Sequence, residues 1–201
     1  MPLFKKILLL ISVIAVAGLL VLNFGIKKVD LNLNISQTPV KILVAELPVK
    51  QAAFGLPVRV RIPGIEVDAP FKYVGITSEG AMDMPKNLDE IAWYKLGHRP
   101  GEIGSAVIAG HYGITKNGQV AAFENLSKII KGDKIYIEDD SGATISFIVR
   151  EIRSYLPTAD TKDVFSSSDG IAHLNLITCE GVWDNSSKSY SGRLVIFAVK
   201  E

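Results

Sequence analysis

The sequence has little cysteine, little histidine and no excess of charge of either sign. Cys179 is the only cysteine among 201 residues, which excludes an intramolecular disulfide and a zinc site built on several cysteines. The 22 basic and 21 acidic residues nearly cancel, so a protein that binds nucleic acid through a basic surface is not expected. Internal repeats and low-complexity tracts are also lacking, and the 48% of hydrophobic residues is typical of a folded chain.

A long hydrophobic run lies near the N-terminus. Residues 7–26 carry no charge and 16 of them are apolar, about the length that crosses a hydrocarbon core of ~30 Å as a helix. We expect residues 1–26 to form an uncleaved, single-pass signal anchor. A signal peptide cleaved after Ala15-Val16-Ala17 is the alternative, although the apolar run continues past that site. Lys5 and Lys6 favour an inside N-terminus, which leaves the remaining chain outside the cell membrane.

The rest of the chain divides near residue 57. Residues 27–57 contain three prolines and no sustained hydrophobic period, and we expect them to form a stalk. Residues 58–201 contain short runs of period 2 bounded by turn residues, which predict a mainly β domain, a closed barrel or sandwich. One short helix is expected over residues 121–131. The expected strands are 58–62, 65–69, 71–77, 105–109, 134–138, 143–152, 174–179 and 193–199.

Cys179 stands at the end of a predicted strand. An unpaired cysteine is usually a small buried side chain. An unpaired thiol in an exported domain favours a functional residue instead, as does the 13-residue connection 180–192 that follows it. If the strands 174–179 and 193–199 are adjacent and antiparallel, Cys179 and Arg193 lie at the same end of the sheet. The guanidinium could then keep a thiolate's surroundings electropositive or bind an oxyanion.

His111 is the strongest candidate for an acid or base among three histidines. It directly follows the buried run 105–109, so it lies at a strand end. His98 is expected in an exposed loop. His173 begins the cysteine strand six residues before Cys179, and about 20 Å of extended strand keeps it away from the thiol.

Three sequence blocks resemble the signature blocks of sortases, and they occur in the same order. They are Gly104-Ser105-Ala106-Val107-Ile108-Ala109-Gly110-His111, Leu174-Asn175-Leu176-Ile177-Thr178-Cys179 and Arg193-Leu194-Val195-Ile196. The resemblance covers residues 58–201 and is greatest to class E and class F sortases. Two positions depart from the family pattern, since Tyr112-Gly113 follows the histidine and Asn175 stands where threonine or serine is common.

The resemblance implies a closed sortase-type β-barrel with one or two short helices, preceded by the transmembrane helix. It also implies a cysteine transpeptidase that cleaves a Leu-Pro-x-Thr-Gly-like sorting signal between threonine and glycine. The thioacyl intermediate would pass to an amine or to water. The roles carried over are Cys179 as nucleophile, His111 as general acid and base, Arg193 as stabiliser of substrate and oxyanion, and Thr178 as an aid to the oxyanion.

The expected partners follow from the same resemblance. They are surface proteins that bear a sorting signal and a cell-wall or pilin amine, at the outer face of the membrane. We expect no cofactor, no bound metal and no nucleic acid. Calcium modulation stays open, because Asp160, Asp163 and Asp169 precede the cysteine strand. They belong to a loop, residues 156–170, that is expected to face the substrate.

Two other functions stay open from the residues alone. An anchored β-domain that only binds a partner would leave Cys179 buried and inert. An L,D-transpeptidase of peptidoglycan also uses a histidine and then a cysteine, but its Ser-His-Gly-Cys type of block is not found near Cys179.

Overall fold

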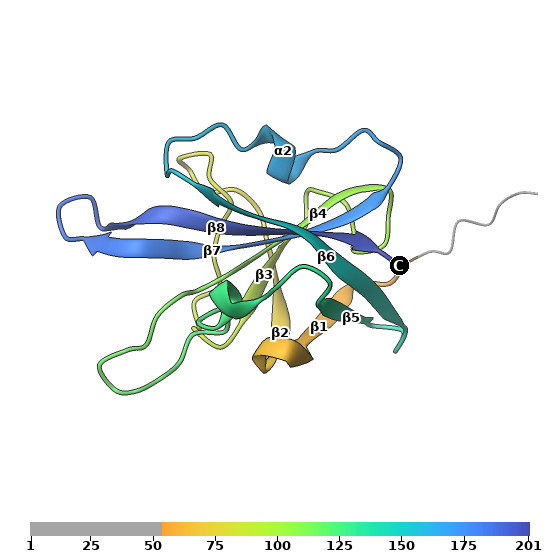
Figure 1. Cartoon of the computed structure of the whole chain (residues 1–201), viewed down its shortest axis with the longest axis horizontal. Coiled ribbons are helices and arrows are strands. Elements are labelled where there is room, and N and C mark those ends of the chain that lie inside the picture. Colours follow the sequence, from red (N-terminus) through yellow and green to blue (C-terminus); the bar gives the residue numbers. More distant parts are fainter. Residues whose placement is uncertain (1–53) are drawn as a thin grey trace, which may run out of the picture. The chain divides into compact units, whose positions relative to one another are not determined.

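Eight strands, most of them with alternating polar and apolar residues, close into a barrel in the computed structural model, which describes residues 54–201 (Figure 1). Around the barrel the order is β1-β2-β3-β4-β7-β8-β6-β5, and β5 pairs with β1. The pairs β2–β3 and β4–β7 are parallel, and the others are antiparallel. The elements are β1 (Pro57–Ile62), η1 (Pro63–Ile65), β2 (Val67–Val74), β3 (Ile91–Tyr94), β4 (Gly104–Gly110), η2 (Leu126–Lys128), β5 (Lys134–Asp139), β6 (Thr144–Tyr155), α2 (Lys162–Phe165), β7 (Ala172–Asp184) and β8 (Ser189–Lys200).

β4 is buried on both of its faces, which explains its uninterrupted run of small and apolar residues. Ala106 and Ile108 belong to the core inside the barrel. Val107 points the other way and packs with Val164 of α2 and Val195 of β8. The segment between β6 and β7 therefore covers part of the barrel's outer face with a second, smaller core.

The predicted mainly β fold is confirmed, with differences at Pro70 and at β3. The predicted strands 65–69 and 71–77 are a single strand, β2, which passes through Pro70. Pro70 pairs with Arg59 of β1. On the other side of β2, the pairing with β3 begins only at Phe71, so no hydrogen bond to β3 needs the backbone N–H that proline lacks. β3 itself was not predicted, because it is only four residues long and has no alternation.

The predicted helix over residues 121–131 is wrong, because only Leu126–Lys128 form a single 3₁₀ turn. The backbone N–H groups of Ala121, Ala122 and Phe123 donate to carbonyls of distant loops, and the later ones bond three residues back. The apolar residues have helical spacing for another reason: Phe123 and Leu126 of this non-helical segment are both buried in the barrel core.

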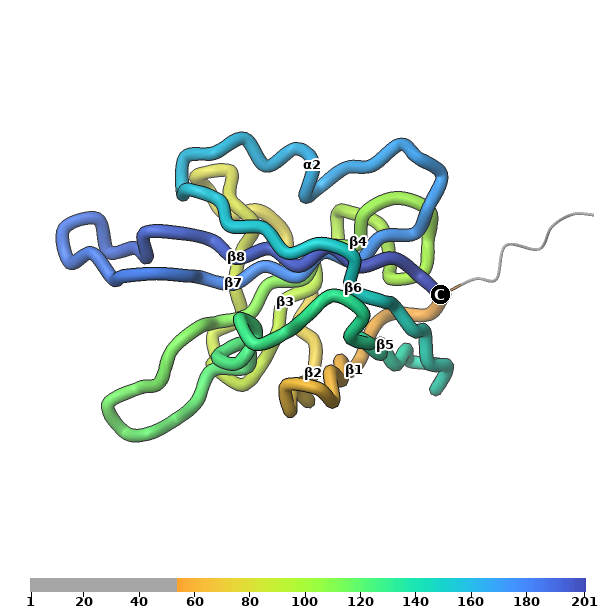
Figure 2. Tube along the Cα trace, in the orientation of Figure 1, coloured from red at the N-terminus to blue at the C-terminus, as the bar shows by residue number. Residues whose placement is uncertain are grey.

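The predicted 13-residue loop 180–192 is also wrong. β7 and β8 continue as a two-stranded ribbon with Trp183 opposite Tyr190 and Asp184 opposite Ser189, so only four residues connect them. The ribbon projects beyond the barrel on the same side as the loop after β4 (Figure 2). A bulge near Gly181, which has a φ of 86°, bends the ribbon where it leaves the barrel.

The predicted signal anchor, residues 1–26, and nearly all of the predicted stalk, residues 27–57, lie outside the described residues. Within residues 54–201, no helix is long and apolar enough to cross a membrane.

We predict that Phe123→Ala lowers the free energy of unfolding by about 3–5 kcal/mol, because the ring is fully buried and fills the space above Gly110. Urea denaturation of the full chain measures the change. Ile130→Ala in the same segment is the matched control, since Ile130 is 63% exposed and its truncation should change stability by less than about 0.5 kcal/mol. Equal losses in the two variants would contradict this account of the core.

Candidate active site

Three neighbouring strands bring His111, Cys179 and Arg193 to one edge of the barrel. β7 pairs with β8 so that Cys179 lies directly opposite Arg193, as the sequence predicted. On its other side β7 runs parallel to β4, and their last pair is Ala109 with Ile177. His111 and Cys179 each follow two residues later, so the same register brings the histidine alongside the cysteine. All three residues line one groove.

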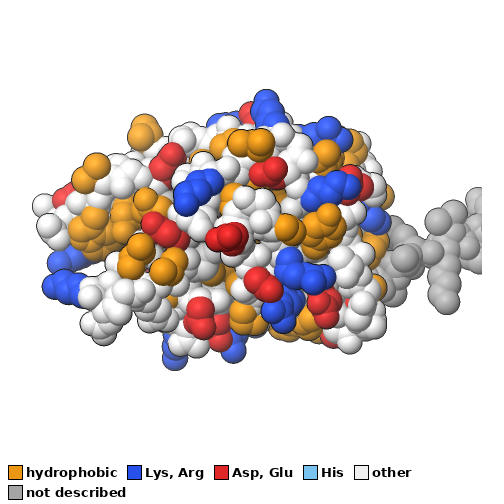
Figure 3. Space-filling view, turned by 60° about the horizontal axis from the view of Figure 1, so that its bottom comes forward, with side chains coloured by type: hydrophobic (Ala, Val, Ile, Leu, Met, Phe, Trp, Pro, Cys, Tyr) orange, Lys and Arg blue, Asp and Glu red, His pale blue; other side chains and the backbone are white. Residues whose placement is uncertain are grey.

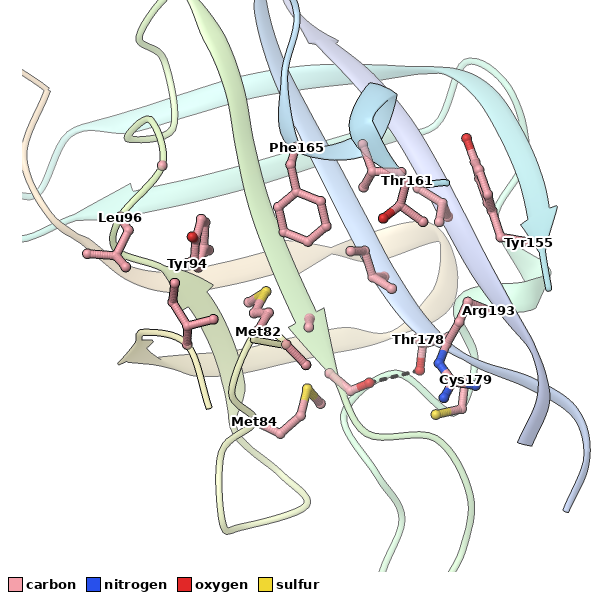
Figure 4. Close-up of a pocket in the computed structure, with 18 of the residues that line it drawn as sticks. Met82, Met84, Tyr94, Leu96, Tyr155, Thr161, Phe165, Thr178, Cys179 and Arg193 are labelled. Carbon is pink, nitrogen blue, oxygen red and sulfur yellow. Dashed lines mark hydrogen bonds between the residues drawn. The ribbon is translucent and has the colours of Figure 1, made fainter. Parts of the chain in front are cut away.

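The groove has a volume of about 980 Å³ and a mostly apolar lining (Figure 4). Its floor is the outer face of β4, β7 and β8. Its walls come from the loop after β2, from the end of β3 with the loop that follows it, and from the segment that contains α2. The apolar and aromatic wall residues are Met82, Met84, Tyr94, Leu96, Val164 and Phe165. This lining suits a bound peptide with apolar side chains, and the predicted substrate-facing segment, 156–170, does contribute to it.

A buried hydrogen bond fixes the ends of β4 and β7 against each other. The Thr178 hydroxyl donates to the Gly110 carbonyl at 2.9 Å, and Thr178 is almost completely buried. These residues directly precede Cys179 and His111, so the bond sets the spacing of the two candidate catalytic residues. Because the hydroxyl proton is used here, Thr178 can offer an oxyanion only its backbone N–H while this bond lasts.

The ring of His111 is oriented by a backbone carbonyl. Its Nε2 lies 2.8 Å from the carbonyl oxygen of Pro85 in the loop after β2. A carbonyl oxygen only accepts hydrogen bonds, so this nitrogen carries a proton. In the neutral ring the other nitrogen, Nδ1, is then the one free to accept a proton. The Pro85 carbonyl thus fixes the tautomer, a task that a carboxylate performs in many other cysteine and serine enzymes.

Arg193 is held by the ribbon on which it stands. Its Nη1 donates to the carbonyls of Tyr190 and Gly192, and its Nη2 donates to the hydroxyl of Ser189. Among the described residues no further partner is recorded for Nε–H or for the second hydrogen of Nη2. This edge of the guanidinium is therefore available to a ligand, and the Arg193 side chain lies next to Cys179 (Figure 4).

The environment of Cys179 keeps it in the thiol form. The side chain is half-buried, and this burial raises the pKa of the thiol, while the charge of Arg193 lowers that pKa to a smaller extent. At neutral pH the thiol predominates, so a nucleophilic reaction requires that its proton be removed. The register brings His111 alongside Cys179, and the Nδ1 nitrogen of its ring is the candidate acceptor.

The groove wall formed by residues 156–171 is anchored by polar contacts. The Asn175 side chain donates to the Val164 carbonyl at 2.6 Å in a buried bond, and Asp163 accepts from Arg153 and Tyr155 of β6. The three acidic residues singled out from the sequence all have such partners, since Asp160 pairs with Lys162 and Asp169 with His173. Within the described part of the chain, no group of three or more metal-ligating side chains is found.

Several contributors to the site were not predicted from the sequence. Pro85 acts through its backbone, which no side-chain pattern reveals. Asn175 was noticed only as a departure from a family pattern, and its buried hydrogen bond to α2 supplies the physical reason for an amide at this position. His98 is exposed, as predicted, but it also lines the groove.

We predict that Thr178→Val destabilises the chain by about 1–3 kcal/mol, because it leaves the buried Gly110 carbonyl without its donor. Thr178→Ser keeps the hydroxyl and should retain most of the stability. Thermal and urea unfolding of both full-length variants measures the difference. If serine and valine prove equally destabilising, the hydroxyl bond is not the important contact.

We predict that alkylation of Cys179 by iodoacetamide accelerates with rising pH and levels off above the usual range for a free cysteine, because burial raises the pKa of the thiol. Arg193→Gln removes the charge that opposes this shift, so the rate at a fixed pH near 8 should fall several-fold. Arg59→Gln, a matched loss of charge on β1, should leave the rate unchanged. A faster reaction in Arg193→Gln would contradict the assigned sign.

Comparison with known proteins is consistent with this geometry. The family described as sortase domain matches residues 60–201. Among solved structures, sortase C-1 from Actinomyces oris has 25% sequence identity and a TM-score of 0.57, and the match covers 72% of this chain and 74% of that chain.

Two further solved structures are similar. Sortase C1 from Streptococcus agalactiae, in a complex with MTSET, has 27% identity and a TM-score of 0.55, with coverage of 71% of this chain and 66% of that one. A lid mutant of sortase A from Corynebacterium diphtheriae has 24% identity and a TM-score of 0.56, and it shares the fold. The match covers 75% of this chain and 72% of that one. No curated protein matches significantly.

The matched domain spans well over half of the chain and contains the whole groove. It includes the histidine, cysteine and arginine that the strand register brings together. The chain belongs to the sortase family of cysteine transpeptidases.

Proposed function

We propose that the chain cleaves a Leu-Pro-x-Thr-Gly-like sorting signal between threonine and glycine and transfers the new carboxyl end to an amine. The observation that carries this proposal is the placement of Cys179 directly opposite Arg193 and alongside His111, at the end of an apolar groove. An inert cysteine in a simple binding domain would need neither the oriented histidine nor the free edge of the guanidinium.

The apolar groove is the proposed site for the sorting signal. A leucine and a proline side chain match its lining of methionine and aromatic residues, such as Met82, Tyr94 and Phe165. Binding there would direct the threonine carbonyl toward Cys179 at the groove's end. The anchored α2 segment keeps this wall in place, which limits the entropy lost when the peptide binds.

Acylation begins with proton transfer from Cys179 to Nδ1 of His111. The thiolate adds to the threonine carbonyl carbon, and the resulting oxyanion accepts hydrogen bonds from the free edge of Arg193. The imidazolium then donates its Nδ1 proton to the leaving amine of glycine. The C–N bond breaks, a thioester on Cys179 remains, and the carboxyl half of the signal leaves.

Deacylation reverses the roles of the same groups. Neutral His111 accepts a proton from the incoming nucleophile, which attacks the thioester carbon. The C–S bond breaks and the Cys179 sulfur leaves. An amine gives a new amide, whereas water gives the free acid. Surface proteins that carry the signal and a cell-wall or pilin amine are the proposed partners.

We also propose that residues 1–26 anchor the enzyme in the cell membrane, with the barrel on the outer side. The uncharged run at residues 7–26 and the lysines before it support this placement. Both substrates of a protein-anchoring reaction lie near that surface. Within the family, the motifs of residues 58–201 support class E or F, while the similar solved structures named above are of classes C and A.

We predict that Cys179→Ala lowers the rate of peptide cleavage at least ~10³-fold and abolishes the thioacyl adduct. Arg193→Lys, which cannot present the same edge, should keep the fold and lower the rate roughly 10²-fold. Cleavage of a fluorogenic sorting-signal peptide measures the rate, and mass spectrometry detects the adduct. Wild-type turnover by Cys179→Ala would refute the assignment.

A further inference from the structure

An aromatic cluster lies between the β7–β8 ribbon and the loop after β4. Tyr190 stacks edge-on against Tyr112, with ring centroids 5.4 Å apart, and against Trp183, with centroids 5.2 Å apart. Trp183 is 45% exposed, which is unusual for the largest apolar side chain. Hydrophobic side chains gather at the end of the barrel where the ribbon and this loop project (Figure 3). The cluster is therefore open to a ligand.

The cluster borders the candidate catalytic residues without lining the apolar groove. Tyr112 directly follows His111 in the chain, and the Tyr190 carbonyl accepts a hydrogen bond from Arg193. None of the three rings belongs to the groove lining. A ligand on the cluster would thus approach Cys179 from outside the groove that the sorting signal occupies.

A carboxylate adds negative charge at this place. Glu124 accepts a hydrogen bond from the Gly113 N–H through one oxygen, Oε2, at 2.7 Å. Its other oxygen, Oε1, has no hydrogen-bond partner among residues 54–201. Burial raises the pKa of the Tyr190 hydroxyl, and the nearby Cys179, Tyr112 and Glu124 add smaller increases. The carboxylate and the cysteine therefore both lie within electrostatic reach of the same ring.

We propose that Tyr112, Trp183, Tyr190 and Glu124 form the subsite that binds the acceptor, a peptide with a protonated primary amine. Aromatic faces attract an ammonium group, and the carboxylate compensates its charge. The assignment deepens the proposed function and rests on it. It separates the two substrates: the apolar groove takes the acyl donor, and the aromatic cluster takes the cationic acceptor.

The bound ammonium gives one proton to neutral His111, and the resulting amine attacks the thioester carbon. The C–N bond forms, the C–S bond breaks and Cys179 leaves as thiolate. The amine nitrogen's second proton passes to solvent, and His111 returns its proton to the thiolate.

The first test measures the ratio of aminolysis to hydrolysis with a sorting-signal peptide and a tripeptide amide that has a free primary amine, below saturation. Glu124→Gln removes the charge while its amide oxygen still accepts from Gly113, and Trp183→Ala removes the exposed ring. We expect the ratio to fall about tenfold in each. Val182→Ala on the same ribbon is the control, because Val182 is 77% exposed and lies outside the cluster.

A ratio within twofold of the wild-type value in either test variant overturns the proposal, because the cluster would then only brace the ribbon. This result differs from failure of the proposed function, in which the wild-type protein would cleave no sorting-signal peptide, with or without the amine.

A second test needs no turnover. The same tripeptide amide and its N-acetylated twin are titrated into the full chain without a sorting signal, and tryptophan fluorescence is recorded. Trp93 is only 3% exposed, so a change reports on Trp183. We expect a saturable change with the free amine, about tenfold weaker binding of the acetylated peptide, and loss of the signal in Trp183→Phe. An equal response to both peptides, or none to either, overturns the proposal.

Discussion

β7 is held in register between β4 and β8, and the site depends on this one constraint. The ladder with β8 sets Cys179 opposite Arg193, and the ladder with β4 brings His111 alongside. The buried bond from Thr178 to the Gly110 carbonyl closes the second ladder at the point where the two candidate catalytic residues follow. A slip of one residue in either ladder would turn a candidate catalytic side chain toward the barrel core, because successive residues of a strand face opposite sides.

The side chains of the site are oriented mostly by backbone carbonyls. The Pro85 carbonyl holds His111, and the carbonyls of Tyr190 and Gly192 hold Arg193. Carbonyls orient the rings and donors without adding a full negative charge beside the thiol. This matters because burial already raises the pKa of Cys179, and a nearby carboxylate would raise it further. The arginine is thus the main charge that favours the thiolate.

The barrel uses its two faces for different purposes. The inner face is a closed apolar core that fixes the strand ends, while the outer face of β4, β7 and β8 is only partly covered, by the segment around α2. The uncovered part forms the groove floor. Stability and the proposed substrate binding can therefore be altered separately, since different residues of the same strands serve each of them. The ribbon beyond the barrel adds a third region, which contributes little to the core and carries the aromatic cluster.

The sequence by itself determined the strand-rich domain, the run at residues 7–26 and the three reactive residue types, because these depend on local periodicity and on chemistry that can be read from single residues. It also predicted that Cys179 and Arg193 meet, since a strand end and the next strand's start lie together in any antiparallel pair. It failed for the helix over 121–131, where backbone hydrogen bonds to distant segments override the local spacing. It also failed for the loop 180–192, where small and polar residues without alternation continue the β7–β8 ladder. Only the tertiary structure decided the parallel pairing of β4 with β7, the carbonyl partners of His111 and Arg193 and the clustering of Tyr112 with Trp183 and Tyr190. Most of these contacts join residues far apart in the chain, and no local pattern encodes which distant strand lies next to which; the Tyr190 and Gly192 carbonyls are near Arg193 in the chain, but they meet its side chain only because the ribbon folds as it does.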